Sequence, residues 1–254
     1  MGESKLKIDV RREKILAELR EKSKVSVSAL SRALGATPVT IRNDLSALER
    51  DGYLTRVSGG AVILSRESEP RAEVTNLTEK QAIARAVASM IHPGDTLFIN
   101  SGTTAQEVAA ELKKLKSLNV VTNCVAVGMQ LSSIPTFRVI LLGGELNPQY
   151  GFIYGGDAQD QLSRYTADWA VLAVDGISAG GGVTTYHAEE AIIDRIMLSA
   201  AKRTIIAADH TKIGRAGFTR VSEISDKICL VTDSIGEGQE SAALRKAGAD
   251  IIFA

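Results

Sequence analysis

The chain has 254 residues, of which 44% are hydrophobic and 24% are charged, enough apolar residues for one large or two unequal globular domains. No apolar run approaches the ~20 residues of a membrane span and no secretory leader opens the chain, which excludes a membrane partner and predicts a cytoplasmic protein. The formal net charge is zero, yet residues 1–64 carry 12 Lys+Arg against 8 Asp+Glu, and residues 65–254 carry 18 against 22. A basic small region beside an acidic larger one is typical of a nucleic-acid binder with an appended domain.

Neither the cysteines nor the histidines show metal-ligand spacing. Cys124 and Cys229 are isolated in apolar surroundings, which predicts buried, reduced thiols. His92 beside a proline is expected at the surface, whereas His187 stands at a predicted helix start, where it could contact a ligand. We therefore expect no metal and no other cofactor.

Two helices are predicted at the start of the chain. Apolar residues at helical spacing indicate a helix from a cap at Asp9 to about Lys22, with Arg11 and Arg12 among its exposed positions. A second helix, 28–34, is predicted to be capped by Ser28 and ended by a glycine that tolerates the left-handed conformation.

A third helix follows a short turn. Thr37 as N-cap and Pro38 as first helical residue predict a helix over 38–51. Two short helices across a turn with glycine form a helix-turn-helix unit, whose second helix enters the major groove of DNA. A small helical bundle with a solvated basic face is the alternative.

Two strands around a glycine turn, 53–56 and 61–64, are then predicted to form a wing. Its side chains could reach the DNA backbone or minor groove. The residues predicted to contact double-stranded operator DNA are Thr37, Val39, Thr40, Arg42, Asn43, Arg56 and Ser58.

These N-terminal residues resemble the DeoR family of bacterial sugar-metabolism regulators. The motifs that carry the resemblance are Arg12-x-x-Ile15-x-x-x-Leu19, Val25-x-Val27-x-x-Leu30-x-x-x-Leu34, Thr40-Ile41-Arg42-Asn43-Asp44-Leu45 and Gly52-x-Leu54-x-Arg56-x-x-Gly59-Gly60-Ala61. Two positions depart from the family pattern, because Asn43 replaces its second arginine and Ser58 replaces its histidine before Gly-Gly-Ala. The resemblance implies a winged helix-turn-helix domain over 1–64, with the helix-turn-helix at about 25–44 and the wing at about 53–64.

A polar, charged stretch over 65–76, interrupted by Pro70, is predicted to be a linker. From residue 77 onward, helical patterns alternate with short apolar strands, which predicts an α/β domain over 77–254 with a mainly parallel sheet. The predicted helices are 77–91, 105–115, 125–131, 188–201 and 240–247, and the predicted strands are 96–99, 120–122, 137–142, 169–174, 204–208, 228–231 and 251–253.

The loop over 100–105 joins a predicted strand to a predicted helix. Its small residues let backbone amides approach an anion, and three hydroxyls stand at the helix N-terminus, as in a phosphate cradle. The same serine and threonine residues could simply cap the helix. No P-loop lysine and no dinucleotide-binding glycine pattern is present, which argues against nucleotide hydrolysis.

The C-terminal region also resembles the DeoR sensor domain, through Gly102-Thr103-Thr104, Leu142-Gly143-Gly144, Asp175-Gly176-Ile177, Thr184-Thr185, Glu189 and Ala208-Asp209-x-x-Lys212. This resemblance implies a fold similar to ribose phosphate isomerases and a phosphorylated sugar or sugar acid as effector. Strand-end loops are where such a sheet binds ligands. The predicted effector residues are Asn100, Ser101, Gly102, Thr103, Thr104, Asn123, Asp175, Gly176, His187, Glu189 and Lys212.

A sugar phosphate isomerase with an accessory nucleic-acid-binding domain is the alternative function. Those isomerases present Asp-Gly-Ala-Asp followed by Lys-Gly-Gly, whereas this chain has Asp175-Gly176-Ile177-Ser178 and then Ala179-Gly180-Gly181-Gly182. The second carboxylate and the lysine are missing, so we predict a regulator, expected to be a repressor, and no enzyme. A single recognition helix reads too few base pairs to select one operator, which predicts a homo-oligomer, a dimer or a tetramer.

Overall fold

The computed structural model describes residues 11–12, 14–19, 22, 24–50, 53–57, 59–63, 75–233 and 238–254. The chain divides into two compact units, residues 1–73 and 74–254. The linker proposed over 65–76 lies almost entirely outside the described residues, as do Asp9, Gly52 and Ser58.

The first unit is a helix-turn-helix with a small antiparallel sheet, as predicted. Residues 11–12 and 14–19 are helical. The elements that follow are β1 (Lys24–Ser26), α2 (Val27–Leu34), α3 (Pro38–Arg50), β2 (Leu54–Val57) and β3 (Gly60–Ile63). The strand order is β1-β3-β2, so the wing strand β3 pairs with β2 on one side and, on the other, with a strand that precedes the helix-turn-helix. Ile15, Leu30, Ile41, Leu45 and Leu54 are fully buried and form the core of this unit.

Two helix caps of this unit can be compared with the sequence predictions. The cap of α2 is Ser26, not Ser28, because the Ser26 hydroxyl accepts a hydrogen bond from the Ala29 amide. Residues 24–26 are paired as a strand, and the cap therefore lies two residues earlier than predicted. Gly35 ends α2 in the left-handed conformation, with φ of 60°, as expected.

The second unit contains a seven-stranded parallel sheet between two layers of helices. The strands of this sheet are β4 (Thr96–Ile99), β5 (Asn119–Thr122), β6 (Arg138–Leu141), β9 (Ala167–Ala173), β12 (Ala201–Ala207), β14 (Ile228–Thr232) and β15 (Asp250–Phe253). The helices are α4 (Leu77–Met90), α5 (Thr103–Leu112), α6 (Val125–Ser132), α7 (Gly156–Leu162), α8 (Ala188–Ala200) and α9 (Gln239–Lys246), with a 3-10 turn, η1, at His210–Lys212.

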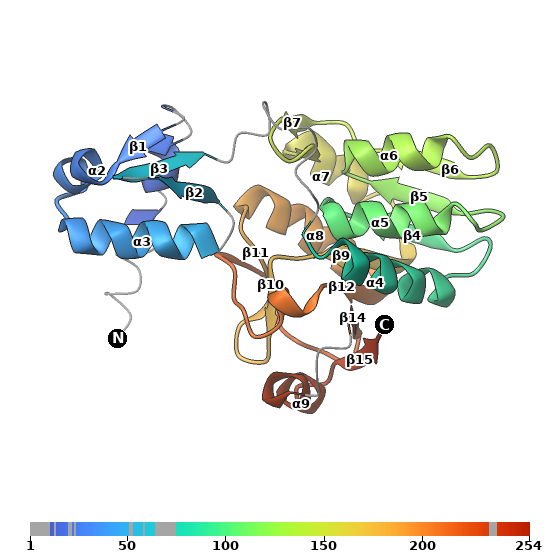
Figure 1. The fold of residues 1–254 in the computed structure, drawn as a ribbon. Coiled ribbons are helices and arrows are strands. Elements are labelled where there is room, and N and C mark those ends of the chain that lie inside the picture. The colour runs from blue at the N-terminus through green and yellow to red at the C-terminus, as the bar shows by residue number, and fades with distance from the viewer. Residues whose placement is uncertain are drawn as a thin grey trace. The chain divides into compact units, whose positions relative to one another are not determined.

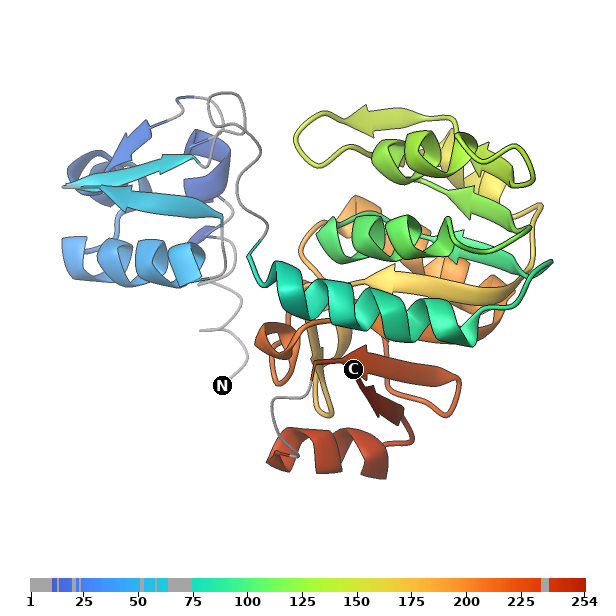
Figure 2. The ribbon, with the colours of Figure 1, turned by 45° about the vertical axis from the view of Figure 1, so that its right-hand side comes forward.

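Each face of this sheet has its own core. Helices α4, α5 and α6 lie side by side over one face (Figures 1 and 2), where Ile83 and Val108 pack against Leu97, Ile99 and Val171. The opposite face packs against α7, α8 and α9. Successive strand residues alternate between the two cores, which explains why these strands are apolar throughout.

The sequence patterns found all seven strands and missed two smaller pieces. One is a hairpin of β7 (Glu145–Asn147) and β8 (Phe152–Tyr154), followed by α7. The other is an antiparallel sheet of order β10-β11-β13, with strands Gly176–Ser178, Gly182–Thr185 and Thr219–Ser222. These strands are three or four residues long, too short to show a period.

Cys124 and Cys229 are both buried and unpaired thiols, as predicted. Trp169 packs partly buried against the core beneath α4, with the Arg203 guanidinium 5.7 Å from its ring centroid. Across the described residues, no helix is long and apolar enough to span a membrane.

Candidate functional site

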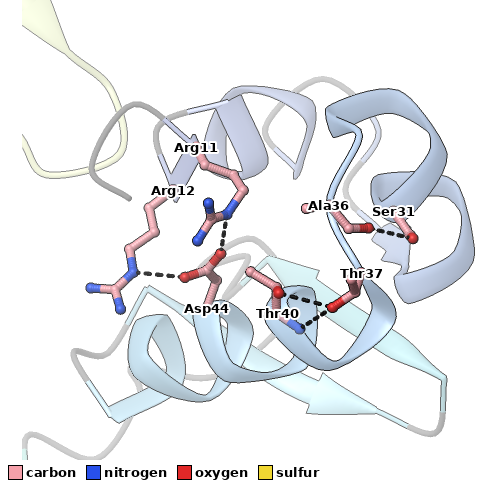
Figure 3. A network of polar contacts seen from close by, with 7 residues as sticks. All are labelled: Arg11, Arg12, Ser31, Ala36, Thr37, Thr40 and Asp44. Atoms are coloured by element: carbon pink, nitrogen blue, oxygen red, sulfur yellow. Dashed lines mark hydrogen bonds and ion pairs between the residues drawn. The ribbon is translucent and has the colours of Figure 1, made fainter. Parts of the chain in front are cut away.

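The orientation of α3 is fixed by a buried carboxylate. Asp44 is 3% exposed, and its two oxygens accept hydrogen bonds from the Nε atoms of Arg11, at 2.5 Å, and Arg12, at 3.3 Å (Figure 3). The prediction that Arg11 and Arg12 are exposed positions is therefore wrong, because both are partly buried in this pair. They tie the first helix to the middle of α3.

The N-terminal end of α3 presents a surface suited to DNA. Val39 is 62% exposed, and Arg42 and Asn43 are exposed beside it. The Thr37 hydroxyl accepts from the Thr40 amide at 3.2 Å and lies 2.9 Å from the Thr40 hydroxyl, so both threonines also serve the helix start (Figure 3). This is the predicted N-cap.

The wing residue Arg56 is held against the side of α3. Its Nη1 donates to the Ser46 hydroxyl at 2.9 Å, and its amide donates to a Glu49 carboxylate oxygen at 2.7 Å. The other wing residue predicted to touch DNA, Ser58, lies outside the described residues. Arg56 remains exposed and can therefore still face a phosphate.

In the second unit, the order of the strands in the sheet creates a topological switch point. The sheet order is β15-β14-β12-β9-β4-β5-β6, so the chain runs from β4 to one edge and then returns to β9 and runs to the other edge. All these pairings are parallel. The switch point thus lies between β4 and β9, and ligands of such sheets bind beyond the carboxyl ends there.

The loop after β4 contains the first group of predicted effector residues. The Asn100 amide is fully used, because its Nδ2 donates to the Ala173 carbonyl and to Asp194 while its Oδ1 accepts from the Ala173 amide. The buried Ser101 hydroxyl donates to Glu190 at 2.5 Å. Both side chains are therefore hydrogen-bonded within the protein and hold the loop in place.

Gly102 opens α5 in a conformation that strongly favours glycine. Its φ is 122° and ψ 162°, and a Cβ atom there would approach the Ala173 Cβ to 3.1 Å. Among the described residues, no side chain caps α5. The amides at its start have no intrahelical acceptor, so they form a positive pole beside Thr103, which is partly exposed, and Thr104, which is buried.

Three carboxylates lie behind this helix start. Asp175 follows β9, and α8 contributes Glu190 and Asp194, which are buried. The Thr185 hydroxyl lies 2.8 Å from a Glu190 oxygen and 3.1 Å from an Asp175 oxygen, and its single proton can serve only one of them at a time. Glu189, the residue predicted from the sequence, is exposed in the first turn of α8.

Burial changes the protonation of two of these carboxyl groups. Desolvation raises the pKa of Glu190 from 4.5 to about 7, against the lowering effect of the Ser101 hydrogen bond. Desolvation also raises the pKa of Asp194, and the neighbouring charge of Glu190 raises it further. The pair therefore holds protons at pH values where ordinary carboxyl groups are ionised.

The end of β5 is covered by the β7–β8 hairpin. Asn123 is fully buried, its Nδ2 donates to the Ile153 carbonyl, and its Oδ1 has no hydrogen-bond partner among the described residues. The backbone of Cys124 forms an isolated antiparallel β-bridge with Phe152 of the hairpin. A buried acceptor without a donor is unusual, and it makes Asn123 a candidate ligand contact.

The loop after β12 brings Lys212 toward the end of β9. Lys212 ends the 3-10 turn that Asp209 caps, and the next residue, Ile213, forms a β-bridge with Ile177 of β10.

Gly176 is buried, and a Cβ atom there would meet the Arg215 carbonyl at 2.6 Å. This glycine therefore permits close packing of the loop that contains Arg215.

Lys80 of α4 is a functional candidate that the sequence patterns missed. It is buried, and its Nζ donates to the Thr75 carbonyl at 2.8 Å. Burial lowers the pKa of its ammonium group. The negative charge of Asp209 raises this pKa, and the positive charge of Lys212 lowers it. A second cation therefore lies near the loop that carries Lys212.

Glu190 and Asp194 were also missed, although the sequence contains a signal for them. Residues 190, 194 and 197 share one face of a helix, and Met197 on that face is fully buried. Carboxylates four residues apart on an apolar helix face should therefore have indicated a buried acidic pair.

Two family models match this chain. A DeoR-like helix-turn-helix domain matches residues 11–67, and the DeoR C-terminal sensor domain matches residues 75–234. The chain belongs to the DeoR family. It is therefore a DNA-binding transcriptional regulator, and α3 is the second helix of its helix-turn-helix.

Several curated relatives align over most of this DeoR-family chain. A putative aga operon transcriptional repressor of Escherichia coli O157:H7 is 33% identical and covers 96% of this chain and 93% of its own. The transcriptional repressor GlcR of Bacillus subtilis is 32% identical, covering 87% and 86%. The glycerol-3-phosphate regulon repressor of Escherichia coli K12 is also 32% identical, covering 87% and 88%.

Among solved structures, the chain is similar to ribose 5-phosphate isomerase A of Methanocaldococcus jannaschii, with a TM-score of 0.39, 14% identity and 52% of each chain covered. Ribose 5-phosphate isomerase of Plasmodium falciparum gives a TM-score of 0.37 at 12% identity over 52% of each chain. Scores this low carry no information about the chemistry of the site.

Proposed function

We propose that this DeoR-family regulator represses a sugar-metabolism operon and that a phosphorylated sugar or sugar acid, bound at the strand ends of the second unit, controls its operator affinity. The observation that carries the proposal is the uncapped start of α5 at the switch point between β4 and β9. A helix N-terminus that begins with glycine favours a dianion. The relatives named above are repressors, one of them of the glycerol-3-phosphate regulon, which supports this assignment.

The phosphate group binds the amides at the start of α5 and the Thr103 hydroxyl. Lys212 supplies a positive charge from the neighbouring loop, which strengthens the hydrogen bonds to the dianion. The hydroxyls of the sugar meet Asn123 and the carboxyl groups of Asp175 and Glu190. Asn100 and Ser101 act indirectly, because their side chains hold the loop in place.

The effector is bound without being consumed. The chain has Ser178 where the isomerase pattern has its second carboxylate, and Ala179-Gly180-Gly181-Gly182 in place of the run that carries its lysine. Proton transfer between two carbon atoms needs a base and an acid that face the substrate. Glu190 is already bonded to Ser101 and Thr185, which favours a structural and binding role over that of a base.

Effector control requires only modest coupling between the two units. If the effector binds the DNA-free and DNA-bound proteins unequally, a 10- to 100-fold change in operator affinity corresponds to ~1.4 to 2.7 kcal/mol. The same coupling must appear in reverse, so operator DNA must change the affinity for the effector by the same factor.

Calorimetry with the full chain tests this function. A panel of sugar phosphates and the matching unphosphorylated sugars is titrated, and each is then added to the complex with an operator selected from randomised DNA. We expect binding from the phosphorylated series only, with a change in operator affinity. Equal binding of the phosphorylated and unphosphorylated series would overturn the proposal. So would an isomerised product, detected by chromatography of the calorimeter sample.

Thr103 offers a matched pair of variants for the same test. Thr103→Asp places a carboxylate where the phosphate group binds, and we expect the effector response to be lost while operator binding remains. Thr103→Asn has nearly the same shape without the charge and should retain most of the response. An unchanged response in Thr103→Asp would place the phosphate elsewhere.

We also propose that the protein binds DNA as a homo-oligomer. One recognition helix reads about three to five base pairs, and two-fold pairing would set two half-sites at multiples of the helical turn. Light scattering on the complex with the selected operator should give a dimer or a tetramer. A monomer on the operator would contradict the proposal.

A further inference from the structure

Aromatic residues are scarce in this chain and concentrate at one place. The sequence has five Tyr, five Phe and one Trp. Five of these rings form, with one histidine, a continuous set of ring contacts that we name the aromatic rim: Tyr150, Phe152, Tyr154, Tyr186, His187 and Phe218. Nearly half of the aromatic residues thus lie around the start of α8.

His187 is the centre of the aromatic rim. Its ring centroid lies 4.6 Å from that of Tyr150, 5.8 Å from that of Phe152 and 5.3 Å from that of Tyr186. Tyr186 in turn lies 6.1 Å from Phe218. The three segments that supply these rings are the β7–β8 hairpin, the β11–α8 junction and the loop before β13.

Hydrogen bonds donated by backbone amides attach the aromatic rim to the strand ends on both sides of β4. On the β5 side, the Ile153 amide donates to the Asn123 carbonyl at 2.7 Å, and the Val125 amide donates to the Gly151 carbonyl at 3.1 Å. On the β9 side, the Tyr186 amide donates to the Asp175 carboxylate at 2.9 Å. The rim therefore adjoins both strand ends that flank the loop with Gly102.

Packing alone does not account for these rings. Phe152 is buried, but Tyr150 and Tyr186 are only partly buried and Phe218 is 49% exposed, and none of these three belongs to either core of the second unit. Half-exposed aromatic side chains beside the carboxyl ends of parallel strands are typical of small-molecule sites. The buried Asn123 Oδ1, which lacks a donor among the described residues, lies beside the same hairpin.

We propose that Tyr150, Tyr186 and His187, together with Asn123 Oδ1, form the subsite for the carbon chain of the effector and make the sensor specific for a phosphorylated carbohydrate over phosphate alone. This inference rests on the proposed function. The C–H groups of a sugar carry partial positive charge and pack on the negative faces of aromatic rings. A sugar hydroxyl donates to Asn123 Oδ1 and thereby satisfies the buried acceptor.

Fluorine NMR of the full chain labelled with 3-fluorotyrosine tests the inference on the unaltered sequence. The five tyrosine signals are assigned with single Tyr→Phe variants, and the probes are inorganic phosphate, glycerol 3-phosphate and glucose 6-phosphate. We expect at least one of the two sugar or polyol phosphates to shift the Tyr150 and Tyr186 signals. Inorganic phosphate should leave both in place, and Tyr53 and Tyr165 should not respond to any probe.

Affinities of variants give the second measurement. Tyr150→Leu and Tyr186→Leu should each weaken binding of the responding phosphate by about 2- to 10-fold, with no change for inorganic phosphate. Tyr165→Phe, which lies outside the aromatic rim, is the control. A loss shared equally by inorganic phosphate would overturn the subsite, because it would indicate a general disturbance of the phosphate site.

The outcomes separate this inference from the function on which it rests. If a sugar phosphate binds by calorimetry but the Tyr150 and Tyr186 signals do not shift, the aromatic subsite is wrong and the phosphate sensor stands. If none of the wider panel of phosphorylated compounds binds at all, the sensor function itself fails. Shifts caused equally by inorganic phosphate would show that the rings respond to the anion and do not select the carbohydrate.

Discussion

The starts of α3 and α5, to which we assign the binding of DNA and of the effector, are built in opposite ways. At α3 the Thr37 hydroxyl accepts from the Thr40 amide, so the chain satisfies its own helix end. At α5 the N-cap is Gly102, no side chain among the described residues caps the helix, and the nearby Ser101 hydroxyl is directed to Glu190. Both stretches are rich in serine or threonine, yet only one of them caps itself.

The difference agrees with the ligand that we propose for each helix. A recognition helix reads DNA with side chains on its exposed face, so its backbone end can be satisfied internally and stay rigid. A helix that binds a phosphate uses the backbone amides themselves, and a capping hydroxyl would compete with the ligand for them. Self-capping therefore separates the two uses of a helix N-terminus.

The largest expected effect comes from closing the open helix start. Gly102→Ala places a Cβ atom against Ala173 and in a backbone conformation that essentially only glycine adopts. Holding the loop in its native conformation then costs ~1 to 3 kcal/mol of strain energy. We expect effector binding to fall by at least ~10-fold and operator binding to be unchanged, by calorimetry with the responding sugar phosphate.

Gly180→Ala is the matched control for that variant, since Gly180 has open space around it and no strained backbone angle. It should bind effector and operator like the parent protein. If Gly102→Ala kept full effector affinity, the open start of α5 would not be the anion site.

The next effect concerns the side chains of α3. Arg42 is exposed on the helix that the structure holds in place through Asp44. Arg42→Ala should weaken operator binding by ~1 to 3 kcal/mol if Arg42 reads a base, and should lower all DNA affinities equally and flatten the salt dependence if it meets a phosphate. Fluorescence anisotropy at several salt concentrations distinguishes the two, and an unchanged affinity would remove Arg42 from the interface.

The same contrast explains which parts of the molecule the sequence could predict. The start of α3 was predicted correctly because Thr37 and Pro38 act on their own neighbours, within one helical turn. The seven parallel strands were found because apolar runs record burial on both faces. Helix caps and buried strands can therefore both be predicted from short stretches of sequence.

The proposed effector site depends on contacts between distant residues, which short stretches do not record. The predicted phosphate contact Ser101 donates its hydroxyl hydrogen bond to Glu190, 89 positions along the chain. Pairing of β11 with β13 places Val183 opposite Ser222, and neither strand shows a period of its own. Glu189, predicted from the family motif, is exposed in the first turn of α8, whereas the buried carboxyl group of Glu190 lies about 100° away around the helix and was not predicted.

A third prediction concerns the acidic pair behind α5. Because the folded protein raises the pKa of Glu190 from 4.5 to about 7, it keeps a proton that the unfolded chain releases. The free energy of unfolding of the second unit should therefore fall as the pH rises from about 4.5 through about 7, by at most ~1.4 kcal/mol per pH unit for this group. Asp194 acts in the same direction.

Urea unfolding followed by fluorescence measures this slope, because the single tryptophan, Trp169, lies in the second unit. Glu190→Gln should flatten the pH dependence, whereas Glu189→Gln, on the exposed side of α8, should retain it. Identical slopes in both variants would show that Glu190 does not hold the proton.

The smallest effect is expected at the self-capped helix. Thr37→Ala removes the acceptor for the Thr40 amide, and loss of such a cap costs typically ~1 kcal/mol. Thr37→Ser keeps the hydroxyl and should keep the cap. Hydrogen exchange by mass spectrometry should show faster exchange at the start of α3 in Thr37→Ala only, with operator affinity reduced and effector affinity unchanged. If Thr37→Ala exchanged like the parent protein but lost operator affinity, Thr37 would contact DNA directly, and the contrast between a self-capped reading helix and an open sensing helix would no longer hold.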